Sequence, residues 1–239
     1  MIISHKYKFV FVEFPQTGSS AVATELMANY EGKRILFKHA LYHEFIHQAS
    51  TEERNYFSFS AIRNPMDVVV STYFKTVTDH DGFLKNEVKH GKWVRRLAMP
   101  LKRRLTGRDV LKNDLDFETY FMKYFRLPYS AWSIMDHKNL DLVMRFEHLG
   151  DDFALALEKM GVDQLRPLPL FNKTGKKDKH FSEYFSSPEV QSRAVKVFGP
   201  YMQEWGYSFP DSWQVEKTKG KALYNAVNLF RKLYWRYLR

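Results

Sequence analysis

The amino-acid sequence predicts an α/β fold: a single domain with a mainly parallel central sheet flanked by helices. Short apolar runs alternate with longer segments of helical periodicity, the pattern of strand–helix units that build parallel sheets. Two of these runs lead through a short turn directly into a helix, and no repeat or low-complexity linker divides the chain. In such a fold the ligand site lies at the carboxyl ends of the strands.

The strands are predicted from four apolar runs that end at prolines, polar turns or charged residues. These runs cover residues 8–14, 34–37, 56–62 and 141–146. Helices are expected where apolar residues recur at helical spacing, over residues 20–30, 66–77, 116–137, 147–161 and 182–205. We therefore expect a main domain over residues 1–212, followed by a basic amphipathic helix over residues 213–239.

The composition is that of an aromatic-rich globular protein. Apolar residues make up 44% of the 239 residues and charged residues 27%, which excludes a disordered chain. The sequence contains no cysteine, so a disulfide framework, a cysteine-ligated zinc site and a thiol nucleophile are excluded. The apolar run at residues 9–14 is too short to cross a bilayer and lacks the features of a signal peptide, so we expect a cytoplasmic protein.

The net charge of +10 is unevenly distributed. Residues 85–112 contain ten Lys or Arg and two acidic residues, and residues 217–239 contain seven Lys or Arg and no acidic residue. The rest of the chain is therefore mildly acidic, which argues against a nucleic-acid partner. Residues 85–112 fit either a solvated surface or a cationic flap or wall that attracts an anionic partner.

The C-terminal segment has the pattern of a basic amphipathic helix. Its apolar side chains recur at helical spacing at Leu223, Val227, Phe230, Tyr234 and Tyr237. Such a helix can dock on its own domain, on a second copy of the chain, or on an anionic membrane surface. The sequence does not choose among these partners.

The turn at residues 15–20 has the form of an anion site. Gly18 permits a close approach of the backbone, Thr17, Ser19 and Ser20 add hydroxyl donors, and the N-terminus of the following helix favours negative charge. The turn lacks the glycine–lysine pattern of nucleoside-triphosphate P-loops, and no Rossmann glycine triplet is present. Ordinary turn chemistry is the alternative explanation.

A second candidate anion ligand is Arg63, at the carboxyl end of the predicted strand 56–62. Ser71 follows about two helical turns into the next helix. Both side chains can donate to one phosphate, the arginine bidentately.

The resemblance to a known family rests on two segments, FVFVEFPQTGSSAVATEL and RNPMDVVVSTYF. They resemble the 5′-phosphosulfate loop and the 3′-phosphate motif of sulfotransferases that use 3′-phosphoadenosine 5′-phosphosulfate (PAPS). The segment MRFEHLGDDF and residues 171–209 resemble, more loosely, later elements of bacterial and carbohydrate-type members. The resemblance implies a P-loop-like fold, PAPS as the donor and 3′-phosphoadenosine 5′-phosphate (PAP) as the product.

The resemblance also implies roles for particular residues. Thr17, Gly18, Ser19 and Ser20 would hold the 5′-phosphosulfate, and Arg63 and Ser71 the 3′-phosphate. A lysine-rich loop often closes over the cofactor in this family. Its candidates here are Lys173, Lys176 and Lys177, with solvated loop lysines as the alternative.

Gln16 departs from the family pattern. Members usually have lysine at this position, where it stabilises the charge that develops on the leaving group. Glutamine can donate a hydrogen bond but brings no charge, so Gln16 stays a candidate for cofactor binding and catalysis with a weakened role. Either another cation substitutes, or the activity is weak, altered or lost. Lys38, at the end of the predicted strand 34–37, is the candidate substitute, and a surface lysine that flanks a strand is the alternative explanation.

Sulfonate transfer to a hydroxyl also needs a base that accepts the hydroxyl proton. We expect this in-line displacement to need no metal. His39 titrates in the right range and lies close to where family members place a catalytic histidine, so we favour it as the base. His43 and Glu44, about one helical turn further on, are the alternatives, and a structural role for His39 is the simplest competing explanation.

The sequence thus predicts a PAPS-dependent sulfotransferase acting on a hydroxyl of a carbohydrate or glycoconjugate, such as a glycan or glycolipid. The alternative is a non-catalytic PAP-, PAPS- or anion-binding protein that lost turnover through Gln16.

Overall fold

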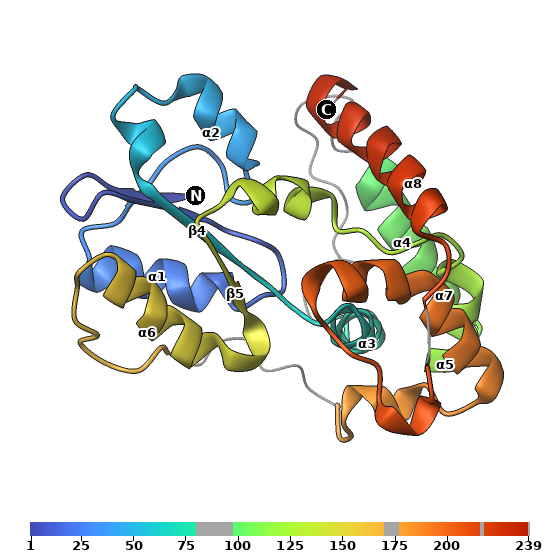
Figure 1. The fold of residues 1–239 in the computed structure, drawn as a ribbon. Coiled ribbons are helices and arrows are strands. Elements are labelled where there is room, and N and C mark those ends of the chain that lie inside the picture. Colours follow the sequence, from blue (N-terminus) through green and yellow to red (C-terminus); the bar gives the residue numbers. More distant parts are fainter. Residues whose placement is uncertain (80–97, 170–176, 216–217, 239) are drawn as a thin grey trace. The chain divides into compact units, whose positions relative to one another are not determined.

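The computed structural model describes residues 1–79, 98–169, 177–215 and 218–238 (Figure 1). They form an α/β structure with a mixed five-stranded sheet in the order β3-β1-β2-β4-β5. Contacts within the chain divide it into two compact units. Unit 1 comprises Met1–Asn64 and Ala131–Lys173, and contains the sheet; unit 2 comprises Pro65–Ser130 and Thr174–Arg239.

The sheet is only partly parallel. Its strands are β1 (Ile2–Ser4), β2 (Phe9–Val12), β3 (Lys33–Arg34), β4 (Phe57–Ile62) and β5 (Leu142–Arg145). Strands β2, β4 and β5 are parallel, as predicted, whereas β1 is antiparallel to both β2 and β3. The prediction of a mainly parallel sheet is therefore wrong on the β1 side. The link from β1 to β2 is a short turn, and a parallel crossover needs about a dozen residues.

The predicted strand at residues 34–37 is also largely wrong. Only Lys33 and Arg34 pair, at the edge of the sheet, and both are exposed. Leu36 has a φ of 53° and His39 a φ of 66°, so the chain leaves the extended conformation directly after the strand. Lys38 consequently lies in an irregular segment and not at a strand end.

Both faces of the sheet are covered within unit 1 (Figure 1). Phe9 and Phe11 of β2 belong to the core that contains residues of α1 (Ser19–Asn29) and α6 (Leu149–Lys159). Val10 and Val12 point to the opposite face, and pack in the core that contains Phe45 of α2 (Tyr42–Gln48). This division follows from the alternation of side chains along a strand, so four consecutive apolar residues serve two cores.

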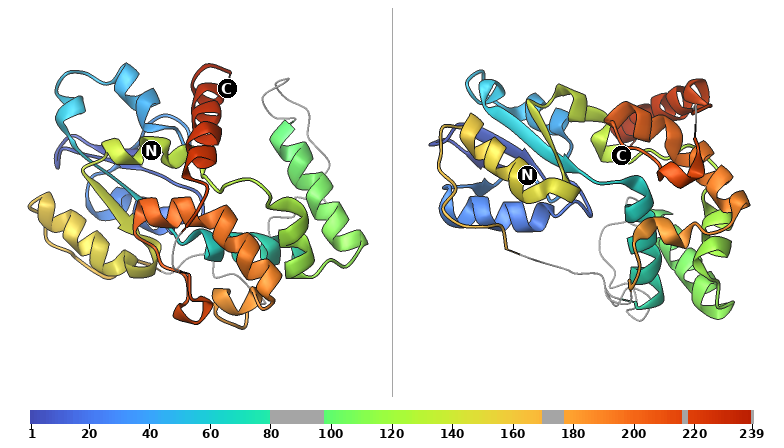
Figure 2. Two further views of the ribbon diagram at one scale, coloured as in Figure 1. Left: turned by 45° about the vertical axis from the view of Figure 1, so that its right-hand side comes forward. Right: turned by 60° about the horizontal axis from the view of Figure 1, so that its bottom comes forward.

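Unit 2 is helical in the part of the chain that the structure describes (Figure 2). Its helices are α3 (Pro65–Val77), α4 (Ala98–Lys112), α5 (Phe117–Tyr124), α7 (Pro188–Trp205) and α8 (Lys221–Leu233). Aromatic rings fill its core: Phe117 and Phe121 each make an edge contact with Phe185, with centroids 4.9 and 5.1 Å apart. None of the helices among the described residues of either unit is long and apolar enough to cross a bilayer.

Helix boundaries differ from the prediction mainly where proline or a capping residue intervenes. The predicted helix 116–137 is α5 followed by an irregular stretch containing Pro128 and the 3₁₀ segment η2 (Trp132–Asn139). The predicted helix 182–205 begins at Pro188, because Ser187 caps it by accepting from the N–H of Val190. The basic segment 85–112 falls partly outside the described residues, and its remainder forms α4.

Candidate active site

The loop between β2 and α1 is stabilised by its own hydroxyl groups. Thr17 Oγ1 and Ser19 Oγ donate to the carbonyl oxygen of Phe14 at 2.9 and 2.6 Å, and both residues are buried. These hydroxyls therefore fix the shape of the loop. Their predicted contact with a phosphosulfate stays a prediction, and the loop's backbone N–H groups become the leading candidates for binding an anion.

The backbone of this loop has the geometry of an anion-binding turn. Gln16 and Gly18 have φ values of 65° and 74°, while Thr17 between them has a negative φ. Turns that alternate in this way point successive N–H groups to one side, and here they lead into the N-terminus of α1. The positive φ of Gly18 favours glycine, and a Cβ at this position would lie 2.5 Å from Leu149 Cδ2, so the end of that side chain would have to shift.

Arg63 reaches this loop from the end of the neighbouring strand β4. Its Nη1 atom donates to the carbonyl oxygen of Gln16 at 3.2 Å, and its guanidinium lies 4.1 Å from the ring centroid of Phe146, directly after β5. Glu147 accepts from the N–H of Asn64 at 2.7 Å and so fixes the turn that follows Arg63. The ends of three parallel strands therefore converge on one arginine, as the sequence predicted for two of them.

Lys38 also reaches the loop. Its Nζ donates to Ser20 Oγ at 3.2 Å, from the irregular segment after β3. The ammonium group is exposed, so it is available to an anion that binds at the loop. The structure thus places a cation beside the turn in which Gln16 replaces the lysine that the family usually carries.

His39 is held in one orientation by the same segment. Its Nδ1 lies 3.0 Å from the carbonyl oxygen of Glu13, which can only accept, so Nδ1 carries the proton and Nε2 the lone pair. Burial lowers the pKa of His39 and the charge of Lys38 lowers it further, while the bond to the Glu13 carbonyl opposes both. The neutral imidazole that a base requires is therefore favoured.

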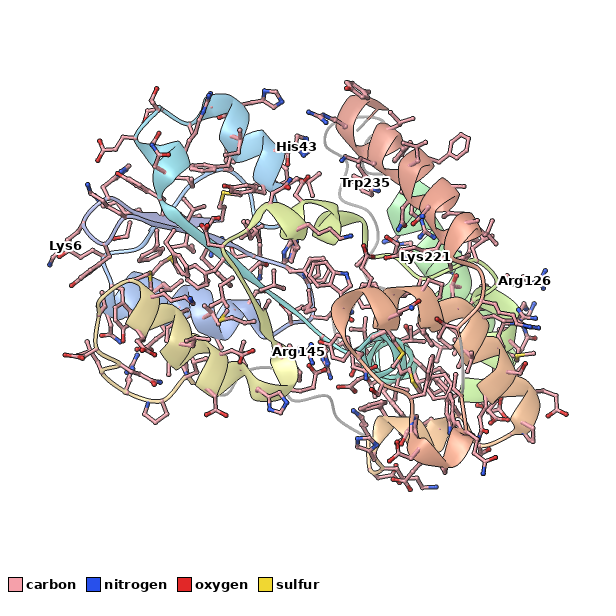
Figure 3. All side chains as sticks on the ribbon, viewed as in Figure 1. Lys6, His43, Arg126, Arg145, Lys221 and Trp235 are labelled. Atoms are coloured by element: carbon pink, nitrogen blue, oxygen red, sulfur yellow. The ribbon has the colours of Figure 1, made fainter. Side chains whose placement is uncertain are left out.

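The two alternative bases have different surroundings. The Glu44 carboxylate accepts from the N–H of Leu41 at 2.7 Å and so caps α2. His43, which projects from α2 in Figure 3, has its Nδ1 3.1 Å from Asp136 Oδ2. His137, which follows Asp136 in the sequence, is buried, and its ring centroid lies 5.3 Å from that of Phe14, at the start of the loop between β2 and α1. Sequence reasoning missed Asp136, since no local pattern marks a partner so distant in sequence.

An ion cluster around the buried Glu13 carboxylate adjoins the site. The Glu13 carboxylate is buried, accepts from the Met1 amino group at 2.8 Å, and pairs with the Arg34 guanidinium. Burial alone would raise the pKa of Glu13, but these two cations outweigh it and hold the pKa below its usual value. The same residue's carbonyl orients His39, so the cluster supports the site as well as the fold.

The remaining predicted ligands belong to unit 2 or lie outside the described residues. Ser71 is buried in α3, one turn after Asp67. Lys177 forms an ion pair with Asp67, which brings this lysine to the face of α3 that carries Ser71. Arg63 belongs to unit 1, so its partnership with Ser71 stays a prediction. Lys173 and Lys176 lie outside the described residues.

The structure is an α/β fold in which a glycine turn, Arg63, Lys38 and His39 lie together in unit 1. The family model described as "Sulfotransferase family" matches residues 1–208. The chain therefore belongs to the sulfotransferase family, whose members are transferases of sulfonate groups and generally use PAPS as the donor. No curated protein and no solved structure matches the chain in the other two comparisons.

Proposed function

We propose that this protein transfers a sulfonate group from PAPS to a hydroxyl of a carbohydrate or glycoconjugate, in a P-loop-like architecture. The observation that supports the proposal is the contact between Arg63 and the Gln16 carbonyl, because an arginine suits a phosphate and this one reaches the turn at residues 16–20. A cytoplasmic location belongs to the same proposal. The acceptor class is supported by the likeness of residues 171–209 to carbohydrate-type members.

The residues present fit the donor. The N–H groups of the turn at residues 16–20 and the N-terminus of α1 suit the doubly charged 5′ end, and Arg63 and Ser71 suit the 3′-phosphate. The donor supplies an activated sulfonate with a good leaving group. Lys38 supplies the positive charge that Gln16 lacks, and so stabilises negative charge that develops at the turn.

His39 serves as the base in this proposal. With Nδ1 bound to the Glu13 carbonyl, Nε2 accepts the proton of the acceptor hydroxyl, and the lowered pKa keeps that atom unprotonated near neutral pH. His43 is the competing base, because Asp136 orients its ring in a comparable way.

Calorimetry with PAP tests donor binding. We expect the wild-type protein to bind PAP, and Arg63→Ala to lose at least about tenfold in affinity, since a charge-assisted bond contributes about 1.5–3 kcal/mol. Arg54→Ala, which removes an exposed arginine of the same unit, is the matched control and should bind as the wild type does. Absence of PAP binding by the wild-type protein would overturn the proposal.

Turnover of labelled PAPS with a panel of glycans and glycolipids tests the transfer step. Transfer to at least one hydroxyl acceptor supports the enzyme. Tight, Arg63-dependent PAP binding without transfer to any acceptor would instead establish the non-catalytic binder that the uncharged Gln16 side chain also allows.

A further inference from the structure

Helix α8 has a continuous exposed apolar face. Phe230 is 75% exposed and Tyr237, just beyond the helix, is 70% exposed. The other large apolar side chains exposed here are Leu223, Leu229, Leu233 and Tyr234. Single exposed apolar residues are ordinary on a protein surface, but these six lie within fifteen residues and form one patch.

The opposite side of α8 attaches the helix to unit 2. Tyr224 is buried and its hydroxyl donates to the Glu204 carboxylate of α7, while Arg231 Nη1 donates to the Pro128 carbonyl at 3.0 Å. At about 100° per residue, Leu233 lies opposite Tyr224 and Phe230 lies roughly 120° away from it. The helix is therefore anchored by polar contacts and turns its apolar face outward, the reverse of an ordinary surface helix.

The charge around this face has one sign. Residues 217–239 contain seven Lys or Arg and no acidic residue. Lys221, Lys232 and Arg236 are exposed, and they lie on the flank of the helix between the anchored side and the apolar face. Figure 3 labels Lys221, the first residue of α8, and Trp235, which follows α8 in the sequence.

We propose that the outward face of α8 binds an anionic lipid surface, with the helix lying in the plane of the interface. Its apolar and tyrosine side chains enter the boundary of headgroups and acyl chains, and its basic flank contacts anionic headgroups. The polar contacts of Tyr224 and Arg231 keep unit 2 attached on the water side.

A second copy of the chain fits this face less well. A symmetric contact between two such helices would bring two clusters of positive charge together without any acidic partner in the segment. The helix is also small for a dimer interface. Its 13 residues span about 20 Å, and a face about 10 Å wide covers about 200 Å², against about 800 Å² per partner in a stable complex.

Co-sedimentation with vesicles tests the proposal, using phosphatidylcholine alone and phosphatidylcholine mixed with phosphatidylglycerol. We expect the wild-type protein to bind the anionic vesicles, and a variant with Leu229→Gln, Phe230→Gln and Leu233→Gln to lose at least about tenfold in partitioning. Lys232→Gln with Arg236→Gln should lose about 30-fold on anionic vesicles, because each basic residue contributes about 1 kcal/mol there.

Leu155→Gln with Leu165→Gln is the matched control, since it removes two exposed leucines of unit 1 and should bind vesicles as the wild type does. All substituted side chains are exposed, so thermal unfolding should not change. Failure of the wild-type protein to bind anionic vesicles, or equal binding by the α8 variants, overturns the proposal. Self-association that disappears in the triple variant, without vesicle binding, would assign the face to a second copy instead. Vesicle binding and self-association are both measured without PAP or turnover, so their outcome is independent of the proposed sulfonate transfer.

Discussion

Replacing Lys38 with methionine is the sharpest test of how the site functions with glutamine at position 16. Lys38 Nζ lies 3.2 Å from Ser20 Oγ at the start of α1. If the developing negative charge lies about 5 Å from Nζ, two unit charges interact by about 1 kcal/mol in water and about 3 kcal/mol at an effective dielectric of 20. Because the lysine is exposed, we expect its charge to stabilise the transition state by about 2 kcal/mol. The rate of transfer should therefore fall about 30-fold.

The assay is turnover of labelled PAPS, with PAP affinity measured in parallel. Lys38→Met should lower kcat more than it weakens PAP binding, because the charge matters most when negative charge develops at the turn. Lys33→Met, which removes another exposed lysine of unit 1, should leave both quantities unchanged. Adding Gln16→Lys to Lys38→Met should restore much of the rate. The left-handed conformation at residue 16 already accommodates a long unbranched side chain.

Two results would refute this reasoning. An unchanged rate in Lys38→Met would show that this cation does not replace the family lysine. A large gain from Gln16→Lys in the otherwise wild-type chain would show that the natural site is impaired, whatever Lys38 does.

Three further predictions concern the base, the loop and the ion cluster around Glu13. His39→Asn should lower turnover about 10²–10⁴-fold, and asparagine tolerates the left-handed backbone at this position. In the wild-type enzyme the rate should fall on the acid side only below pH 6.5, because burial lowers the pKa of the histidine. A full rate in the variant would assign the base to His43. Gly18→Ala should lower the urea midpoint of unfolding and weaken PAP binding, since a Cβ at this positive φ strains the turn and displaces the end of the Leu149 side chain. Unchanged stability and binding would contradict a need for glycine in this turn. Glu13→Gln should destabilise the protein by about 3 kcal/mol in urea unfolding at neutral pH. Because the pKa of Glu13 is lowered in the folded state, its contribution to stability is present above the unfolded pKa and is lost as the pH falls through the folded pKa. The difference in unfolding free energy between wild type and variant should therefore shrink in acid. A difference that stays constant with pH would exclude this ion cluster as the cause.

The three parallel strands and their helices could be predicted from local pattern. The apolar runs at β2, β4 and β5 are long enough to identify a strand, and the turns after β2 and β4 carry proline, glycine and small polar residues. The pairing of β1 with β2 and β3 could not be predicted in this way. A three-residue apolar strand and a two-residue exposed edge strand have too little pattern of their own, and they form only because the sheet offers them hydrogen bonds.

The site likewise has a part that local sequence determines and a part that only the tertiary structure decides. The sequence alone determined the residue types of the site: a glycine turn and an arginine after two strands, a lysine–histidine pair, and glutamine in place of lysine. Only the tertiary structure decided which atoms meet: Lys38 with Ser20, His39 with the Glu13 carbonyl, and Arg63 with Gln16 and Phe146. It also turned the apolar face of α8 outward. The physical reason is the distance along the chain over which each effect acts. Turn and helix preferences depend on a few neighbouring residues, whereas these contacts join segments that only the packed sheet and helices bring together.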